Sequence, residues 1–491
     1  MDQNPFQPPL PPRVVRRVPS SRIEPAPPGP TAKRLAFEEN NQIPVKQQQN
    51  TVQELLSNRY TNDTLREYLQ QIVYLGQGTF GNTFSGAVPC SDRIKDSFRS
   101  RDYVGKLFAD KGAAEKEYAI QKIIRRIDPL RIYTVQAIKF CDPYLPSNTS
   151  SILFNKVKSA GHTPKRSYVS QIVYPYGGIP LHKLVSVVDM FFPAFFLCAM
   201  TGYMNEIQKV YHTDIKEDNI MYNIVSQKFV LIDFGRTASD LRDITNTFVY
   251  TAFLKMLKKN NDPMFIFYTQ LSPEVMYFCN MVRYISWNLS QNREISLLDF
   301  NEIFTRELSQ RIKYINLEKV IKSFSDNYGS MLFPLYESFI HRVISTFKIH
   351  GSELDRLKSE LTEKVVATVN HLVARQDIWG LSYTMYRFFK SKYGNDSRSL
   401  ILTEFLNENV LSVPDAERPN LIDLHQMLCA KFSSFDKLFI PQYTEFIQKI
   451  YDTSSKSQNI VNNETQVIVQ EKTYVENLIK SLSANITEPS Q

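Results

Sequence analysis

The chain has 491 residues, 43% of them hydrophobic and 22% charged, which is enough material for a globular protein with two lobes and additional segments. Its formal net charge of +8 comes from lysines and arginines that are scattered among acidic residues. This distribution argues against nucleic acid as a partner and favours a mildly basic solvated surface.

The N-terminal segment, residues 1–50, contains many prolines, glutamines and arginines and shows little periodicity, so we expect a disordered arm. Because it is proline-rich and polar, we expect no secretory signal there. The run from Pro8 to Arg13 fits a polyproline ligand with a trailing arginine, the type that binds Src-homology-3 domains. A plain flexible arm is the alternative, since such runs arise easily in proline-rich tails.

A glycine-rich loop is formed by Gly76, Gly78 and Gly81. Glycines let backbone N–H groups approach phosphates closely. A dinucleotide-binding turn uses the same spacing but leads into a helix. Here strand-like runs lie on both sides, at 71–75 and 82–86, so the sequence predicts a strand–loop–strand lid over phosphates.

Lys106 stands in a strand-like apolar run, which is unfavourable for an ammonium group unless it meets an anion. We therefore expect it to bind phosphate. Its expected partner is an acid on the following helical segment, and Glu117 is preferred to Glu115 because Ile120 and Ile124 recur three and seven residues later on the apolar face. The alternative for Glu117 is an ordinary solvated helix acid.

A second group of polar residues follows at Asp214, Lys216 and Asn219, and Asp233 comes directly after the apolar, strand-favouring run 229–232. Phosphoryl transfer needs a carboxylate near the attacking hydroxyl and metal ions on the phosphates. Asp214 suits the first task, and Asn219 and Asp233 suit the second, while Lys216 can reach the transferring phosphate. The alternative is a polar loop that uses Asp and Asn only for turns.

Together these motifs, in this order, resemble the eukaryotic-type protein kinase family. The resemblance extends to Ser272-Pro273-Glu274, where the family has Ala-Pro-Glu, and to the segment 377–382, which is similar to the start of the buried central helix. Arg418 is similar to the late arginine that pairs with that glutamate. The similarity covers about residues 70–435 apart from one insert.

The resemblance implies an α+β, bilobal protein kinase-like fold with a small antiparallel β lobe and a large helical lobe. The expected boundaries are 51–175 for the small lobe and 176–440 for the large lobe. A helical insert is expected at about 283–370, within the long connection 275–376. The apolar residues from Leu354 to Leu372 predict one of its helices. A tail, 441–491, is expected to contain a linker at 452–459 and a short helix at about 467–482, which either docks on the protein or stays free of it.

The resemblance also implies the site. ATP and Mg²⁺ are the expected ligands, with the three glycines and Lys106, held by Glu117, around the phosphates. Asn219 and Asp233 are expected to hold magnesium. Asp214 is expected to orient and deprotonate a protein Ser or Thr hydroxyl with support from Lys216, the residue type of serine/threonine kinases.

Several positions depart from the family. Thr213 stands where many kinases have an arginine, so we expect activity to depend less on phosphorylation of the activation segment, although Arg236 and Arg242 could substitute. Thr83 replaces the valine under the adenine, or Phe84 takes that role.

The connection between the lobes, at residues 171–178, is also unusual. Ile172 is expected near the back of the adenine pocket, and Pro175 removes one backbone donor there. Gln121 is polar where the family often places an apolar contact.

Two other functions stay open: a pseudokinase scaffold that binds partner proteins, and a small-molecule kinase. Retention of all the proposed catalytic groups argues against the first. The Pro-Glu and Asp-x-Trp signals favour protein substrates over the second. The divergent linker, the missing arginine and the insert resemble kinases encoded by large DNA viruses.

The compartment is expected to be intracellular, cytoplasmic or nuclear, or the host cell or virion for a viral protein. The longest apolar stretch, 190–200, is about half a membrane span, so no transmembrane segment is expected. Neither a disulfide framework nor a structural metal site is expected, because the cysteines are odd in number and include no metal-type pairs. The five are Cys90, Cys141, Cys198, Cys279 and Cys429.

Overall fold

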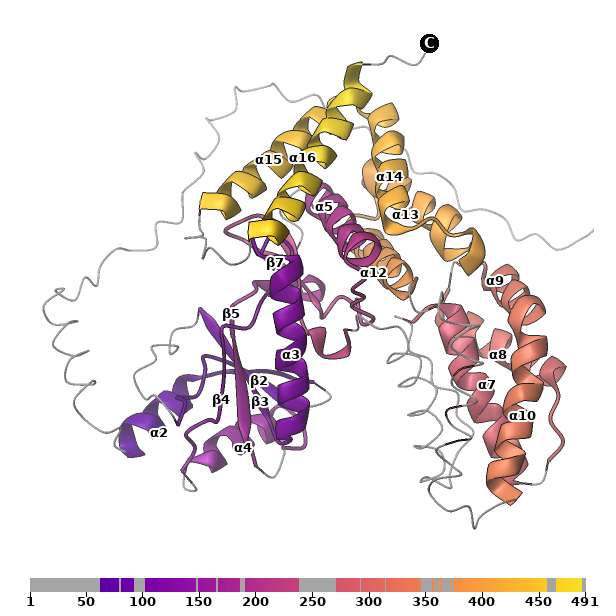
Figure 1. Ribbon diagram of the computed structural model, residues 1–491, viewed down its shortest axis with the longest axis horizontal. Coiled ribbons are helices and arrows are strands. Elements are labelled where there is room, and N and C mark those ends of the chain that lie inside the picture. The colour runs from indigo at the N-terminus through magenta and orange to yellow at the C-terminus, as the bar shows by residue number, and fades with distance from the viewer. Residues whose placement is uncertain are drawn as a thin grey trace, which may run out of the picture. The chain divides into compact units, whose positions relative to one another are not determined.

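The computed structural model describes residues 62–237, 271–345, 375–456 and 465–487, together with the isolated positions 356, 359, 363 and 372. Short gaps within these ranges fall at 79–80, 92–101, 147–148, 165–166, 186–189, 292 and 314. The expected N-terminal arm and its polyproline run therefore lie outside the described residues. The described elements belong to one compact unit, Thr61–Gln491 (Figure 1).

A five-stranded antiparallel sheet precedes most of the helices in the chain (Figure 1). Its order is β1-β2-β3-β5-β4, and its strands are β1 (Tyr74–Gln77), β2 (Gly81–Ser85), β3 (Tyr103–Phe108), β4 (Lys139–Cys141) and β5 (Ser170–Pro175). The expectation of an α+β fold with a small antiparallel sheet is confirmed.

Three helices accompany this sheet: α2 (Asn62–Gln71), α3 (Lys111–Ile127) and α4 (Ser150–Ser159). Helix α3 begins after Asp110, whose side chain accepts hydrogen bonds from the backbone N–H groups of Gly112 and Ala113. Its buried face includes Glu117 beside Ile120 and Ile124. The carboxylate of Glu117 therefore lies on the buried face of the helix.

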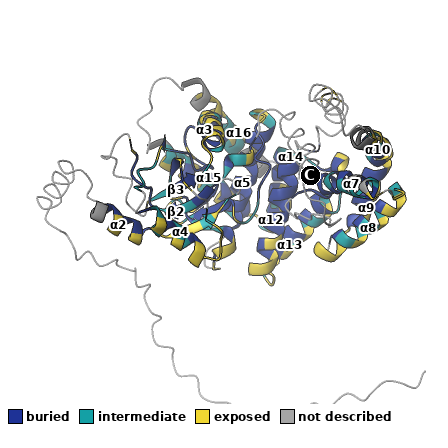
Figure 2. Ribbon diagram, turned by 90° about the horizontal axis from the view of Figure 1, so that it is seen from below, coloured by how far each residue is buried: buried dark blue, intermediate teal, exposed yellow. Residues whose placement is uncertain are grey.

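The helical part of the chain is built around α5 (Phe191–Gly202) and α12 (Gln376–Lys392), which Figure 2 shows as mostly buried. Helix α5 is apolar on almost all sides, as the run 190–200 predicted, and this composition suits a helix that is surrounded by others. No helix among the described residues is long and apolar enough to cross a membrane. Helices α13 (Ser397–Leu406) and α14 (Leu421–Phe435) complete this core.

A second sheet of three short antiparallel strands lies next to α5 in the chain. Its members are β6 (Ile179–Pro180), β7 (Ile220–Asn223) and β8 (Lys228–Leu231). The polar segment 211–219 leads directly into β7, and Asp233 follows β8. Because β7 and β8 pair, the two segments lie side by side at one end of this sheet.

The connection between Glu274 and Asp377 is mostly helical in its described residues. It contains α7 (Pro273–Ser290), α8 (Leu297–Arg311), α9 (Leu317–Phe324) and α10 (Ser330–Ser345). Tyr277 is fully buried among the rings of Phe300, Phe304 and Phe324. The helix expected over Leu354–Leu372 lies largely outside the described residues.

The C-terminal tail contains two helices, α15 (Phe439–Lys456) and α16 (Thr465–Thr487). The predicted linker at 452–459 was wrong as far as Lys456, because Thr453 donates its hydroxyl hydrogen bond to the Lys449 carbonyl and so fits within the helix. Helix α16 is longer than expected and docks on the protein, with Val475 and Leu482 buried. The phenol of Tyr474 donates to the Ala199 carbonyl on α5.

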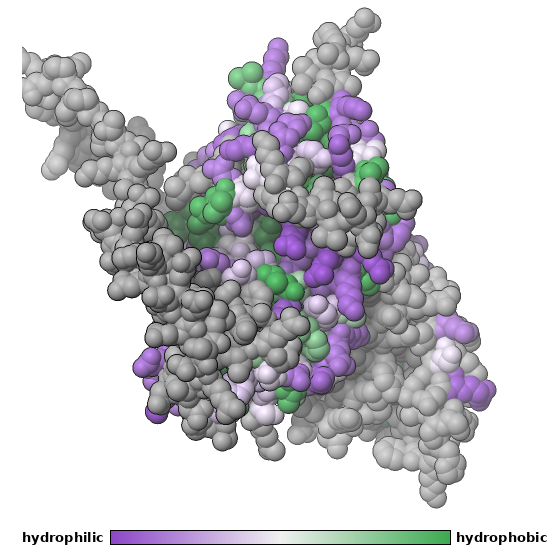
Figure 3. Space-filling model, turned by 60° about the vertical axis from the view of Figure 1, so that its left-hand side comes forward, coloured by the Kyte–Doolittle hydropathy of each residue, from purple (hydrophilic) through white to green (hydrophobic). Residues whose placement is uncertain are grey.

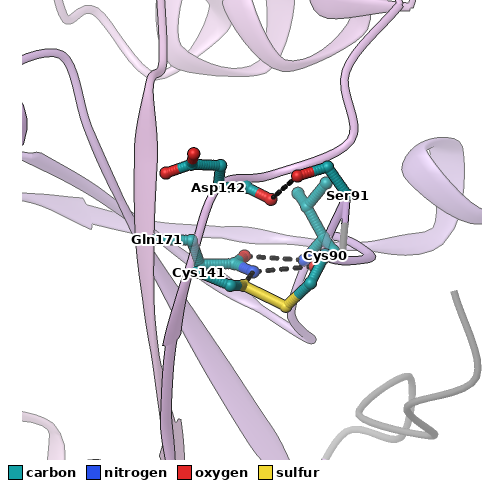
Figure 4. The surroundings of a disulfide bond; sticks show 6 residues. Cys90, Ser91, Cys141, Asp142 and Gln171 are labelled. Carbon is teal, nitrogen blue, oxygen red and sulfur yellow. Dashed lines mark hydrogen bonds between the residues drawn. A yellow bond between two sulfur atoms is a disulfide. The ribbon is translucent and has the colours of Figure 1, made fainter. Parts of the chain in front are cut away.

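A disulfide joins Cys90 and Cys141, which are 51 residues apart in the sequence and have their Cα atoms 5.8 Å apart (Figure 4). The side chain of Gln171 on β5 lies beside it and hydrogen-bonds both backbone groups of Val88. The expectation of no disulfide was therefore wrong for this pair, because only the fold brings the segment after β2 against β4.

The described surface in the view of Figure 3 is mainly hydrophilic, and its hydrophobic side chains form small separate spots. Most large apolar side chains of the described chain belong instead to one extended core around α5, α7, α12 and α14. This division is typical of a folded unit that buries its apolar surface internally.

Candidate active site

Lys106 is the centre of the first cluster of functional side chains. Its ammonium lies 2.9 Å from both carboxylate oxygens of Glu117 and 2.8 Å from Oδ1 of Asp233. The lysine is 7% exposed and Glu117 is 2% exposed, so both charges are sheltered from water. The preference for Glu117 over Glu115 agrees with this geometry, and Asp233, 127 residues after Lys106, joins the pair from a distant segment.

The strand register explains how this cluster forms. Thr83, Lys106 and Ile172 are direct partners across β2, β3 and β5, so their side chains share one face of the sheet. Phe84, the next residue, lies on the opposite face, where its ring contacts Tyr168. Phe84 is therefore not on the Lys106 face, and Thr83 is.

The glycine-rich loop lies beside the lysine. A Cβ atom on Gly78 would be 3.8 Å from Cε of Lys106, and the Gly78 N–H donates to the Gly81 carbonyl at 2.8 Å. A Cβ atom on Gly81 would be 2.5 Å from the backbone oxygen of Leu107, a distance that real side chains do not tolerate. Gly81 is thus required by the close approach of β2 and β3, while Gly76 has open space around it.

A second cluster contains Asp214, Lys216 and Asn219. The Lys216 ammonium is 3.0 Å from Oδ2 of Asp214, and the Asn219 amide donates to the Asp214 backbone oxygen at 2.8 Å and to Oδ2 at 3.1 Å. The backbone N–H of Ile232 donates to the Asn219 carbonyl at 3.0 Å. This bond places Asp233, the next residue, beside the second cluster.

Asp377, at the start of α12, holds the loop that carries Asp214. Its carboxylate accepts the backbone N–H groups of His212 at 2.6 Å and Thr213 at 2.7 Å. Burial raises the pKa of Asp377, and the nearby His212 and these backbone donors only partly offset that effect. Thr213 adopts a left-handed backbone conformation with φ of 61°, which costs energy for a β-branched residue and persists because the loop is held on both sides.

His212 links the two segments. Its Nε2 is 2.9 Å from the Ile232 carbonyl, which can only accept, so Nε2 carries the proton. Its Nδ1 then accepts the backbone N–H of Asp214 at 3.3 Å. The ring also packs on Phe234, which is buried directly after Asp233. One histidine therefore contacts both polar segments and sets their relative position.

The segment after Asp233 contacts the loop that carries Asp214 through one hydrogen bond and one pair of opposite charges. The Thr213 hydroxyl donates to the Arg236 carbonyl at 2.9 Å. The Arg236 guanidinium lies 3.7 Å from Oδ1 of Asp214. Arg242 lies outside the described residues.

The charge balance of the Lys106 cluster favours the ionised forms. Burial alone would lower the pKa of Lys106, but Asp233 and Glu117 raise it above its usual value. Burial likewise opposes ionisation of Asp233, yet Lys106 and other nearby groups bring its pKa below the usual value. The cluster therefore keeps an ammonium and a carboxylate side by side near neutral pH.

At the back of the cluster lies a residue that the sequence analysis did not single out, Tyr174. Ile172 is fully buried with Phe108 and Ala114, whereas Tyr174 on β5 reaches Glu117 and donates its phenolic hydrogen bond to Oε1 at 2.8 Å. Strand alternation puts both residues on one face, and only the longer tyrosine side chain spans the distance. The sequence feature that could have indicated Tyr174 is a tyrosine, with its polar hydroxyl, near the end of an apolar strand.

The remaining polar departures have partners. Gln121 is buried one turn beyond Glu117, and its side-chain oxygen accepts the Ala137 N–H at 3.0 Å. Glu274 and Arg418 form a buried ion pair with N–O distances of 2.7 and 3.1 Å. The pairing that the resemblance implied is therefore present.

Neither a scan against models of protein families nor a search of curated proteins finds a match for this chain. In the part of the chain that the structure describes, no group of three or more His, Cys, Asp or Glu side chains is placed to hold a metal ion.

Proposed function

We propose that this chain is an ATP-dependent serine/threonine protein kinase. The observation that carries the proposal is the Lys106 ammonium between Glu117 and Asp233, at 2.9 and 2.8 Å, next to a loop in which Lys216 and Asn219 both contact Asp214. A buried lysine between two carboxylates matches the phosphate-positioning group that phosphoryl transfer requires.

The two sheets and the helices support a bilobal arrangement. In this proposal the five-stranded sheet with α3 is the small lobe, and the helices around α5 and α12 form the large lobe. Lys106 and Glu117 belong to the first, and Asp214 and Asn219 to the second. Asp233 is shared, since it follows β8 and contacts Lys106. ATP would bind between them, under the loop of Gly78 and Gly81.

The residues present fit magnesium. Asn219 donates both of its amide hydrogen bonds to Asp214, which leaves its side-chain oxygen as the ligand atom, and Asp233 provides a carboxylate. One or two protein oxygen ligands completed by phosphates are what Mg²⁺ usually takes in such sites. Bound there, magnesium would neutralise charge on the phosphates.

The protein groups divide the chemistry between them. Asp214 orients the substrate hydroxyl and accepts its proton as the hydroxyl oxygen bonds to the terminal phosphorus, while the bond from that phosphorus to the bridging oxygen breaks and ADP leaves. Lys216, 3.0 Å from Asp214, supplies positive charge to the transferring group. Lys106 holds the remaining phosphates, and Glu117 keeps its ammonium in place.

The decisive experiment measures transfer of labelled phosphate from ATP to a generic basic protein by the wild type and by Asp214→Asn. We expect the variant to lose roughly 10²- to 10⁴-fold in rate, the usual contribution of a general base. Asp326→Asn is the matched control, because Asp326 is exposed and lies in η4 (Ser325–Gly329), which contributes no residue to the proposed site.

The alternatives predict other outcomes. Nucleotide binding without transfer by either protein would favour a pseudokinase scaffold. Transfer only to a small metabolite would favour a small-molecule kinase. Equal transfer by wild type and Asp214→Asn would overturn the proposed role of Asp214.

A further inference from the structure

The carboxylate of Glu117 has a partner from a third element. Besides the two contacts with Lys106 on β3, its Oε1 accepts the phenolic hydrogen of Tyr174 at 2.8 Å. The same oxygen thus receives a charged donor and a neutral donor. Helix α3 is tied at this point to β3 and to β5.

Packing fixes the position of the Tyr174 ring. It packs against the buried cluster of Val135, Met221 and Val230 and also against a second buried cluster that includes Ala114 on α3. The ring therefore packs against two clusters to which β7, β8 and α3 contribute residues. A tyrosine has few rotatable bonds, so a ring packed in this way places its hydroxyl with little freedom.

The hydrogen bond acts on Glu117, whose partner Lys106 also contacts a second carboxylate. Lys106 is shared between Glu117 and Asp233 at nearly equal distances. A donor on Glu117 that does not depend on the lysine keeps that carboxylate, and the turn of α3 that carries it, in place when the ammonium also binds phosphate. Tyr174 remains protonated in this role, because burial and the adjacent Glu117 raise its pKa well above the ordinary value.

We propose that Tyr174 is a positioning residue of the phosphoryl-transfer site, whose hydroxyl orients Glu117 and through it Lys106. This inference rests on the proposed kinase function. The end of β5 then does more than line the nucleotide site. Through Glu117, Tyr174 connects the segment that joins the two lobes to the buried Lys106.

The test compares Tyr174→Phe with the wild type and with the control Tyr176→Phe. Tyr176 is two residues away in the same segment and is 44% exposed. In Tyr174→Phe we expect kcat for protein phosphorylation to fall roughly ten-fold, the value of one hydrogen bond to a charged group. The KM for ATP should change much less, and Tyr176→Phe should match the wild type.

A double-variant cycle with Glu117→Gln separates positioning from a general structural role. If Tyr174 acts through Glu117, adding Tyr174→Phe to Glu117→Gln should lower kcat by less than two-fold further, an arithmetic expectation of coupled sites. Independent, multiplicative losses would overturn the inference. Loss of cooperative unfolding in Tyr174→Phe would also overturn it, because the hydroxyl would then serve folding.

The two levels of the proposal fail differently. If the wild type phosphorylates protein and Tyr174→Phe does so with unchanged kcat and KM, the positioning role is overturned and the kinase function stands. If neither the wild type nor Asp214→Asn transfers phosphate, both are overturned.

Discussion

Arg418 and Glu274, 144 residues apart in the sequence, form a fully buried bidentate ion pair. The guanidinium also donates through Nε to the Val410 carbonyl and lies 5.1 Å from the centre of the Trp379 ring. The pair therefore joins the start of α7 to the segment before α14, over the central helix α12. A second buried carboxylate, that of Asp415, lies 3.6 Å from the Arg418 guanidinium, so the stability of these charges depends on one another.

Replacing Arg418 with methionine should destabilise the protein by about 3 to 5 kcal/mol, because it leaves the Glu274 carboxylate buried without its cation. The free energy of unfolding from urea titration measures this change. Lys319→Met is the matched control, since Lys319 forms an ion pair with Glu417 at 3.3 Å but both side chains are more than half exposed. That variant should stay within about 1 kcal/mol of the wild type. Equal losses in the two variants would contradict the prediction.

Side chains whose chemistry demands a particular partner could be predicted from the sequence. An ammonium in an apolar strand needs an anion, so Lys106 pointed to an acid on the next helix, and the structure supplies Glu117. Sequence order and spacing likewise brought Asp214 and Asn219 together. These predictions concern residues whose partners lie on adjoining elements or are fixed by motif spacing.

Long-range contacts between ordinary residues could not be predicted. Nothing in the spacing of Cys90 and Cys141 indicates that β4 returns to the segment after β2. Tyr174 was missed because its reach depends on where α3 packs on the sheet. Glu471, in a tail helix expected to be short, is fully buried, and only the docking of α16 reveals this.

Reduction of the Cys90–Cys141 disulfide should destabilise the protein by about 2 to 4 kcal/mol, because the bond closes a long loop in the unfolded chain. Unfolding is measured with and without a reductant that keeps the cysteines reduced. The variant in which both cysteines are serine should be less stable than the oxidised wild type and should not respond to the reductant. A wild type whose stability is the same under both conditions would contradict the prediction.

Glu471 on α16 meets Asp128 at the end of α3 in a buried cluster. Asp128 accepts three backbone N–H groups and the hydroxyl of Thr134, so it is the better placed of the two to carry the charge. Glu471 accepts the Leu130 N–H at 3.3 Å. Burial and the Asp128 carboxyl raise its pKa well above the ordinary value, so Glu471 holds the proton of the pair. Lys228 faces both acids, and burial lowers its pKa to about 8.

The docking of α16 should weaken as the pH rises. A carboxyl whose pKa is raised by folding contributes its full stability below the unfolded pKa, about 4.3, and loses it as the pH increases toward the folded value. Glu471→Gln keeps the shape without the ionisation, so we expect it to stabilise the protein by about 1 to 3 kcal/mol at pH 8 relative to wild type and to change little at pH 4. Unfolding at both pH values measures this. Glu476→Gln, at an exposed site on the same helix, is the control. A stability gain that is equal at both pH values would contradict the assignment.

Thr213 joins the loop that carries Asp214 to the segment after Asp233 through an uncharged contact. Its backbone N–H is held by Asp377 at 2.7 Å, and its hydroxyl donates to the Arg236 carbonyl at 2.9 Å. A phosphorylated segment is usually anchored by arginine, and this position offers a neutral donor instead. We therefore expect phosphatase treatment to leave at least half of the kinase activity, measured as transfer to the generic basic protein.

The same contact predicts a loss in Thr213→Val. Valine keeps the β-branched shape and the strained backbone but removes the donor to Arg236. The rate of transfer should fall about three- to ten-fold, the value of one neutral hydrogen bond, and the fall should be the same before and after phosphatase treatment. Thr453→Val is the control, because Thr453 lies on the exposed face of α15, where its hydroxyl donates to the Lys449 carbonyl. Near-complete loss of wild-type activity on dephosphorylation would show that phosphate anchors the segment and that the Thr213 contact is secondary.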